Sequence, residues 1–378
     1  MTKVGIMSMQ RIFNYGSSLQ AYALRRLLEG VQPHSEVSFV DYQPGPTLVN
    51  GPANRVERLG RVGRTLAKVH SYTKTEVGPR NTIRFINHKK SYAKNYFPMI
   101  GVSEVANRRP ALDLQVIGSD EVFNCVQSNT RVGYSPELFG RDSRASRVVS
   151  YAGSFGSTTM DKIEQAGIRR ELADSFAGFH AISVRDENSR QIVEHLTGRS
   201  PEVHVDPTLV YNFGDSTALI PRHRQLQEKY IIVYGYPGRF NEDENAVIKR
   251  YAKEINARVI SFGGNQGSTD QFVDCDPFTL LAYFRDAAAV ITDTFHGTIF
   301  SIINEVPFAT IVRSTQGGES GNREKLSSLL GHFGLSDRIL KNTEGLRELI
   351  AEPIDFKSVR ALRSMERERT LAYLESVV

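Results

Sequence analysis

The chain has 378 residues, of which 40% are hydrophobic and 24% are charged, and its net charge is +5. This composition is typical of a soluble globular protein, and the length favours two domains over a single core. The two cysteines, Cys125 and Cys275, are far apart and belong to no C-x-x-C pair, which argues against a disulfide framework and a structural zinc site.

The first ten residues, MTKVGIMSMQ, contain no long apolar run, so the sequence predicts no signal peptide. No apolar stretch approaches the length of about 18 residues that a membrane-spanning helix needs. We therefore expect a cytoplasmic protein.

The excess positive charge is confined to residues 55–94. This segment holds eleven Lys or Arg residues against two Glu residues, whereas the rest of the chain has 36 basic and 40 acidic residues. A local basic surface suits an anionic partner such as the inner membrane face or a lipid diphosphate. No RNA-binding aromatic signature or zinc-finger spacing accompanies the charge, so nucleic acid is not expected as a partner. A solvated helical face explains the same charge without any partner.

Short apolar runs rich in β-branched residues alternate with helical patterns along the chain. In chain order, strands are predicted at 3–7, 36–42, 114–120, 147–153, 180–186, 202–207, 229–237, 257–264, 288–293 and 307–313. The first helix is expected to begin at Ser17 or Ser18 and to stop at Gly30. This alternation favours α/β domains with parallel sheets and helices on both faces.

Residues 206–228 mix proline, glycine and charges with little periodicity, and we interpret them as the connection between two domains. The first domain is then 1–205 and the second 229–355. Residues 356–378 resemble one amphipathic helix, which is expected to pack back on the first domain. The predicted architecture is two Rossmann-like, doubly wound domains facing a cleft, with ligands at the carboxyl ends of the strands.

The turn after the first strand is one candidate site. Asn14, Tyr15 and Gly16 precede the helix that is expected from Ser17, and the free N–H groups of a helix N-terminus can bind an anion. The stretch lacks the G-x-G-x-x-G pattern, so it predicts no dinucleotide site. Taken alone, these residues are more often an ordinary capped loop.

A second candidate follows the strand at 114–120, which delivers Gly118, Ser119 and Asp120 to the functional edge of a sheet. Asp120 could orient a hydroxyl group or accept a proton. In the alternative, Ser119 or Asp120 simply caps the next helix.

Arg185 ends another strand, where its guanidinium could clamp a carboxylate or a phosphate. In the alternative, Arg185 forms a salt bridge with Asp186 or Glu187.

The stretch ITDTFHGTIF, 291–300, passes from a strand into a helix for which Asp293 or Thr294 is the expected N-cap. His296 then lies in the first helical turn, where its side chain and the N–H groups around Gly297 and Thr298 would face a phosphate. No H-x-x-x-H pattern supports a metal. A lone histidine is otherwise more often structural.

In these motifs and their order, the chain resembles the polysaccharide pyruvyl transferase family. The matching stretches are NYGSSLQAYAL (14–24), VIGSDEVFN (116–124), SVRDENS (183–189), VDPTL (205–209), TDTFHGTIFSI (292–302) and NREKLSSLLGHFGLSDR (322–338). They follow the family's order and cover nearly the whole chain.

The resemblance implies a GT-B-like fold and transfer of the enolpyruvyl unit of phosphoenolpyruvate to a pair of sugar hydroxyls. The product would be a pyruvate ketal on a cell-surface polysaccharide or its lipid-linked oligosaccharide precursor. The donor carries a phosphate and a carboxylate, so the site needs cations and helix N-termini, and a His or Asp must move protons. No metal or redox cofactor is implied.

Carried over by motif, His296 is implied for phosphate contact or acid–base work, and Arg185 for the anion clamp. Arg323, near the start of a later helix, is a further anion-binding candidate. The residues expected on the first-domain side, toward the acceptor, are Asn14, Tyr15, Gly16, Ser17, Gly118, Ser119 and Asp120.

One position departs from the family pattern. Some members carry an arginine two residues before the motif histidine, where it binds the donor phosphate, but here that position is Thr294. The cation is then expected from Arg185, Arg313 or Arg323, or the donor is held differently.

Two other functions are compatible with the sequence. One is a glycosyltransferase with a nucleotide-sugar donor, for which the glycine-rich stretch 262–270 could serve. The other is a non-catalytic protein that binds anionic glycans or lipid-linked sugars. The polar groups expected at several strand ends argue against this second function.

Overall fold

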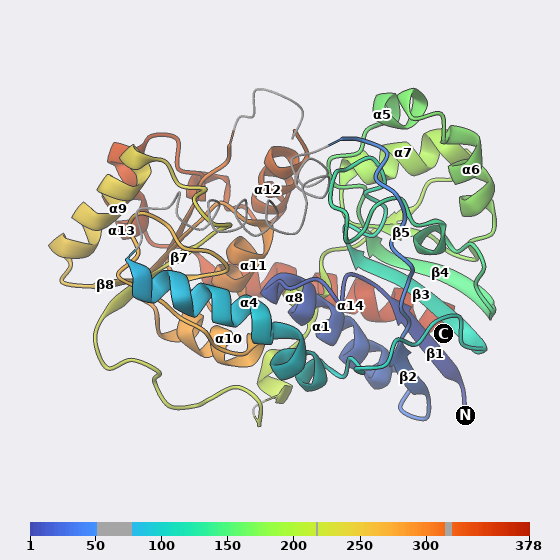
Figure 1. Ribbon diagram of the computed structural model, residues 1–378, viewed down its shortest axis with the longest axis horizontal. Helices are drawn as coiled ribbons and strands as arrows, with labels where there is room; N and C mark the ends of the chain where they lie inside the picture. The colour runs from blue at the N-terminus through green and yellow to red at the C-terminus, as the bar shows by residue number, and fades with distance from the viewer. Residues whose placement is uncertain (51–77, 217, 314–319) are drawn as a thin grey trace.

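The computed structural model describes residues 1–50, 78–216, 218–313 and 320–378, and it contains two parallel sheets (Figure 1). The first sheet has the order β2-β1-β3-β4-β5-β6. Its strands are β1 (Lys3–Met7), β2 (Glu36–Phe39), β3 (Leu112–Asp120), β4 (Ala145–Gly153), β5 (Ser183–Val184) and β6 (Glu202–Val203).

The second sheet has the order β11-β10-β7-β8-β9. Its strands are β7 (Tyr230–Tyr234), β8 (Arg258–Phe262), β9 (Gln271–Phe272), β10 (Ala289–Thr292) and β11 (Phe308–Thr310). The short strand β9 was not predicted, because two residues carry no periodicity. The strand order reverses at β1/β3 in the first sheet and at β10/β7 in the second, as in doubly wound folds. The predicted fold class is confirmed.

Helices cover both faces of the first sheet. Successive strand residues point to opposite faces, and apolar side chains on both faces have to be buried. Val116 of β3 packs in the same hydrophobic cluster as α1 (Tyr15–Val31) and α14 (Phe356–Val377). Ile117 packs on the other side. That side is covered by α5 (Met160–Gln165), α6 (Arg169–Ala177) and α7 (Glu187–Thr197).

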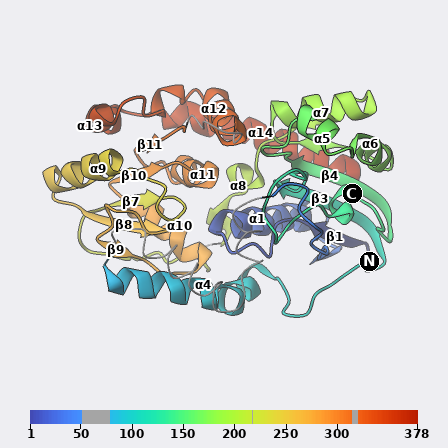
Figure 2. The ribbon, with the colours of Figure 1, turned by 45° about the horizontal axis from the view of Figure 1, so that its top comes forward.

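The second sheet is layered in the same way (Figure 2). Ile232 of β7 faces α10 (Pro277–Asp286), α11 (Phe295–Ile303) and α12 (Ser320–His332). Ile231 faces α9 (Glu242–Glu254) and α13 (Leu346–Ala351). Four short 3₁₀ helices complete the described elements: η1 (Pro136–Phe139), η2 (Phe213–Ser216), η3 (Ser336–Arg338) and η4 (Thr343–Gly345).

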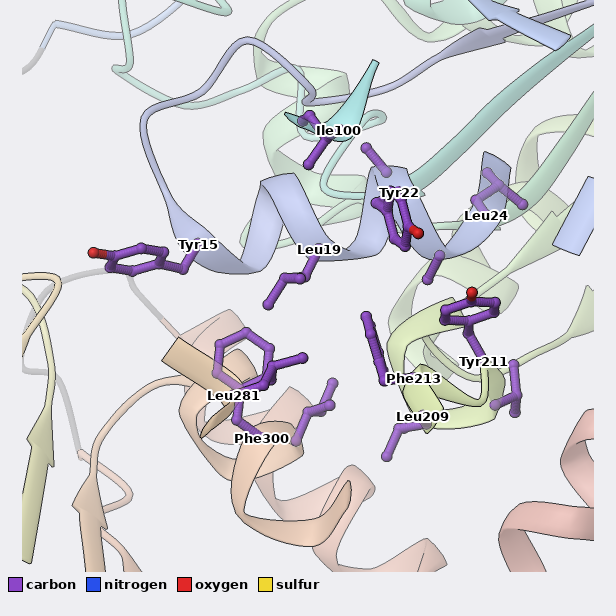
Figure 3. Close-up of a cluster of buried hydrophobic side chains, with 14 of the residues drawn as sticks. Tyr15, Leu19, Tyr22, Leu24, Ile100, Leu209, Tyr211, Phe213, Leu281 and Phe300 are labelled. Atoms are coloured by element: carbon purple, nitrogen blue, oxygen red, sulfur yellow. The ribbon is translucent and has the colours of Figure 1, made fainter. Parts of the chain in front are cut away.

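The two domains share a continuous hydrophobic cluster (Figure 3). In it, Leu19 of α1 and Leu209 of the short helix α8 (Pro207–Val210) lie with Leu281 of α10 and Phe300 of α11. Residues 206–228, expected as an irregular connection, thus contain a buried helix. The apolar residues Leu209, Val210, Tyr211 and Phe213 explain this, since they belong to the hydrophobic cluster that both domains share.

Helix α4 (Pro79–Ile100) also contacts both domains. Its Tyr92 hydroxyl lies 2.9 Å from the Ser18 hydroxyl on α1, and Nδ1 of His88 lies 2.7 Å from Oδ1 of Asp274 in the second domain. The C-terminal helix α14 lies against the first sheet, where the Tyr373 hydroxyl donates to the Ser150 carbonyl oxygen at 2.7 Å.

Helix α1 differs from its prediction at both ends. It begins at Tyr15, with Asn14 as its N-cap, and it continues through Gly30 to Val31. Buried Leu27 and Leu28 hold its last turns against the core, which outweighs the modest helix penalty of one glycine. Within the residues that the structure describes, no helix combines the length and the apolar character needed to cross a membrane.

Candidate active site

A cavity of about 640 Å³ lies between the two domains and is lined by residues from both. Its walls include residues that directly follow β3 and β7, and residues that directly follow β10. These strands flank the positions where the order of each sheet reverses. Such positions leave a crevice at the carboxyl ends of the strands, where ligands of doubly wound folds bind. The cavity is therefore the candidate active site.

The cavity brings together many of the residues singled out in the sequence. Those that line it are Asn14, Tyr15, Ser17, Asp120, Arg185, Asp293, Thr294 and His296. Those outside its lining are Gly16, Gly118, Ser119, Gly297, Thr298 and Arg323. Ser119 is fully buried, Thr298 bonds to Thr310 inside the second domain, and Arg323 is exposed.

The N-terminus of α1 reaches across to the second domain. The Asn14 side chain accepts from the Gly16 N–H at 2.7 Å and donates to the Tyr236 hydroxyl at 3.3 Å. A Cβ atom on Gly16 would lie 2.2 Å from Cγ of His296. No side chain fits in that space, so Gly16 permits the close approach of α1 to the histidine.

His296 sits in the first turn of α11, as predicted. Thr294 caps this helix by accepting from the Gly297 N–H at 3.0 Å. The imidazole is 11% exposed, and its Nε2 atom lies 3.4 Å from Oδ2 of Asp206. Nε2 makes no hydrogen bond among the described residues, so the imidazole and the carboxylate are in contact without a formal bond.

Arg185 is held between two carboxylates. Its Nη1 donates to Oδ2 of Asp206 at 2.8 Å and lies 3.6 Å from Oδ1 of Asp120. The guanidinium carbon lies 4.4 Å from the centre of the Phe295 ring. The alternative salt bridge with Asp186 or Glu187 is wrong. The Asp186 side chain caps α7, and Glu187 forms a salt bridge with Arg190, one turn later in the same helix.

Asp206 was not among the predicted site residues, although it touches both principal candidates. It is fully buried and accepts from the N–H and the hydroxyl of Thr208 as well as from Arg185. Burial raises the pKa of the Asp206 carboxyl, but contact with His296 and the charge of Arg185 outweigh burial and hold that pKa well below its ordinary value. The carboxylate is thus a fixed negative charge beneath the histidine.

Asp120 is oriented by Ser17 of α1, whose hydroxyl donates to Oδ2 at 2.9 Å. The Asp120 backbone has a φ of 75°, in the left-handed region that non-glycine residues rarely adopt. No helix directly follows Asp120, so the alternative that it caps one is wrong. Its carboxylate lies instead at the cavity wall beside Arg185.

Asp293 is a paired carboxylate at the end of β10. Its Oδ2 accepts from Nε of Arg313 at 2.9 Å and lies 3.0 Å from Nε of Arg239. Arg313 also bonds to both carboxylate oxygens of Glu244, and it is absent from the cavity lining. Arg239 lines the cavity. Sequence reasoning missed Arg239 because it lies in a polar loop without a motif.

A cross-domain ion pair closes one side of the cavity. Lys325 of α12 bonds to Glu121, which directly follows β3. Burial raises the pKa of the Glu121 carboxyl, but the nearby Lys325 ammonium outweighs it and lowers that pKa to about 2. Among the described residues, no group of three or more His, Cys, Asp and Glu side chains could hold a metal ion.

A family profile described as polysaccharide pyruvyl transferase matches residues 14–315, which include most of the cavity lining from both domains. The chain belongs to the polysaccharide pyruvyl transferase family. Membership makes the protein a transferase that acts on polysaccharide, and it confirms the resemblance drawn from the motifs. No curated protein is similar enough in sequence to be matched to the chain.

Solved structures with a similar arrangement of elements are distant in sequence. A putative UDP-N-acetylglucosamine 2-epimerase from Listeria monocytogenes has 11% identity and a TM-score of 0.46, covering 100% of this chain and 91% of its own. Arabidopsis thaliana UGT89C1, complexed with UDP-L-rhamnose, has 10% identity and a TM-score of 0.45, and the match covers 99% of this chain and 98% of UGT89C1. An O-GlcNAc transferase from Thermobaculum terrenum has 13% identity and a TM-score of 0.40. This chain is covered to 99% in that match and spans 64% of the transferase.

Proposed function

We propose that this family member transfers the pyruvyl group of phosphoenolpyruvate to two hydroxyls of a saccharide acceptor as a cyclic ketal. The observation that carries the proposal is the placement of His296 against the buried carboxylate of Asp206 in a cavity that also holds Arg185. A proton-transfer group beside fixed cations suits a small anionic donor that must be protonated and must lose phosphate.

The reaction balances within this site. Two bonds form between acceptor oxygens and C2 of the donor, while the bond between C2 and the phosphate oxygen breaks and the C2–C3 double bond becomes a single bond. C3 gains a proton and becomes a methyl group. The two protons of the acceptor hydroxyls are thereby accounted for, one on the methyl carbon and one on the phosphate.

His296 is the group proposed to move these protons. Nε2 faces the Asp206 carboxylate, and this leaves Nδ1 as the ring nitrogen without a carboxylate contact among the described residues. Asp120, oriented by Ser17, is the second candidate to accept a proton from an acceptor hydroxyl.

Three cations on the cavity wall are proposed to hold the donor's phosphate and carboxylate. They are Arg185, Arg239 and Lys325. Arg239, in the loop after β7, and Lys325, on α12, belong to the second domain. With the N-terminus of α11 they offer positive charge to the same cavity that Thr294 lines. Arg239 therefore replaces Arg313 and Arg323 as the proposed source of the cation that Thr294 cannot supply.

A phosphate-release assay tests the proposal. The protein, phosphoenolpyruvate and a panel of lipid-diphosphate oligosaccharides should release inorganic phosphate only when a suitable acceptor is present. His296→Asn should abolish the release while leaving the circular dichroism spectrum unchanged. Release of nucleotide from a nucleotide-sugar, with no phosphate from phosphoenolpyruvate, would overturn it.

Association with the inner membrane face, through residues 55–94, stays a prediction. Residues 51–77, which carry much of that charge, lie outside the described part of the chain. Within the described part, Lys89 lies on the cavity wall rather than on a solvated face. Co-sedimentation with anionic and neutral liposomes at low salt tests the prediction, which fails if the two vesicle types bind equally.

A further inference from the structure

Lys89 is the cavity cation that the proposed chemistry does not use. It lies on α4, and its Nζ atom donates to the carbonyl oxygen of Phe13 at 3.0 Å. The same ammonium lies 5.7 Å from the centre of the Phe85 ring. A neutral carbonyl and an aromatic face thus surround a charged group that lines the cavity.

The other lysine and arginine residues of the cavity wall have carboxylate partners. These pairs are Arg185 with Asp206, Arg239 with Asp293, and Lys325 with Glu121. Within the described part of the chain, no carboxylate pairs with Lys89. Among the described residues, Lys89 is therefore the cavity-lining cation without a carboxylate partner.

A second cation, Arg131, lies near Lys89 but outside the cavity lining, and its side chain is exposed. The guanidinium carbon of Arg131 lies 4.4 Å from the centre of the Phe13 ring, so two cations flank one residue. Burial, with a smaller contribution from Arg131, lowers the pKa of the Lys89 ammonium to about 8. The ammonium remains mostly charged at neutral pH, and a partly buried charge without a counter-ion is costly.

The backbone around Lys89 is well anchored. His88 bonds to Asp274 in the second domain, and Tyr92 bonds to Ser18 on α1. The residues before and after Lys89 in the helix thereby fix its position relative to both domains. A binding group on a fixed helix is better placed than one on a free loop.

We propose that Lys89 binds an anionic group of the acceptor saccharide, either a carboxylate or a phosphate, and that Arg131 adds positive charge from the side of Phe13. An anion there would supply the missing counter-charge and form charge-assisted hydrogen bonds with the ammonium. The assignment to the acceptor rests on the proposed function, because the other cations already serve the donor. The anion site itself stands on the contacts of Lys89.

Binding of three sugars, measured without phosphoenolpyruvate, tests this subsite. The probes are glucuronic acid, glucose 1-phosphate and glucose, added to the full chain after reductive methylation of its lysines with ¹³C-formaldehyde. The resonance lost in Lys89→Arg identifies Lys89. It should shift with at least one of the two anionic sugars and not with glucose, and the responsive probe distinguishes carboxylate from phosphate.

Matched variants complete the experiment. Lys89→Met should weaken binding of the responsive sugar by about tenfold to a hundredfold, the value of one charge-assisted hydrogen bond. Lys90→Met, an exposed neighbour on the same helix, should leave binding unchanged. No shift with either anion, equal shifts with glucose, or unchanged affinity in Lys89→Met would overturn the subsite. Since no turnover is measured, these results are independent of whether pyruvyl transfer occurs.

Discussion

Nε2 of His296 lies 3.4 Å from Oδ2 of Asp206, and the same carboxylate oxygen accepts a hydrogen bond from Arg185. One buried negative charge therefore contacts both the proposed proton-transfer group and a proposed anion clamp. Asp206 itself forms and breaks no covalent bond in the proposed reaction. Its proposed effect is on the geometry and charge of the two residues that meet the donor.

Replacing Asp206 by Asn should lower the phosphate-release rate by about a hundredfold to ten-thousandfold, since an ill-placed acid–base group loses its contribution. Asp243→Asn, at an exposed position of α9, is the control and should behave as wild type. Comparable rates in both variants would remove Asp206 from the account.

The stability of Asp206→Asn should also depend on pH in a defined direction. The pKa of Asp206 in the folded chain lies below its ordinary value of 3.8, so its stabilisation is complete above that value and is lost as the pH falls through the folded pKa. Urea unfolding should therefore show the largest deficit of the variant at neutral pH, and a shrinking deficit below about pH 4. A deficit that is constant with pH would contradict the assignment of a buried charge.

Replacing Gly16 by Ala should abolish most activity without unfolding the protein. The new Cβ would collide with the His296 ring, and a displacement of about 1 Å in an active site costs on the order of a hundredfold in rate. Gly30→Ala lies on the same helix in open space, and it should keep full activity and gain slight stability. Full activity in Gly16→Ala would show that the ring position is not critical.

Replacing Arg185 by Ala should destabilise the fold, because it leaves the buried carboxylates of Asp206 and Asp120 without their cation. The expected cost is about 3–5 kcal/mol in the free energy of unfolding. Arg185→Lys keeps the charge but loses the planar fork, so it should fold and still lose most phosphate release. The control is Arg170→Lys, at an exposed position of α6. Wild-type stability of Arg185→Ala would contradict the buried ion pairs.

Replacing Lys89 by Met should stabilise the protein at pH 7 by on the order of 2 kcal/mol, since it removes a partly buried charge. The folded pKa of about 8 lies below the ordinary value of 10.5, so the penalty is full below pH 8 and disappears as the pH rises through 10.5. Urea unfolding against Lys90→Met should show the gain shrinking over that interval. A loss of stability at pH 7 would argue that Lys89 is a structural residue.

The sequence predicted the sheets well because β-branched runs such as Ile231–Val233 are buried on both faces of a sheet, and such runs are typical of central strands. It also assigned Asp120 and Arg185 to strand ends and His296 to the turn after a strand, and the carboxyl ends of parallel strands form the edge where ligands bind. Each lies at or just beyond such an end.

What the sequence did not reveal depends on contacts between distant segments. Asp206 stands at the start of a proline-containing stretch that has the composition of a connection, and only packing between the domains buries it. Lys89 lies in a basic run typical of a solvated surface, yet α4 turns it toward the cavity. Gly118 and Ser119 follow the apolar part of β3, but they lie inside the first domain. Ser119 is fully buried, and a Cβ atom on Gly118 would lie 2.0 Å from the Tyr151 carbonyl oxygen.

The central claim is that the bond between C2 and the phosphate oxygen of phosphoenolpyruvate breaks at this site. Phosphoenolpyruvate labelled with ¹⁸O at that bridging oxygen, incubated with the protein and a productive acceptor, tests it by mass spectrometry. The account predicts that the label appears in inorganic phosphate, while the acceptor gains the mass of one pyruvic acid less one water. Label retained in free pyruvate, with an unmodified acceptor, would contradict it.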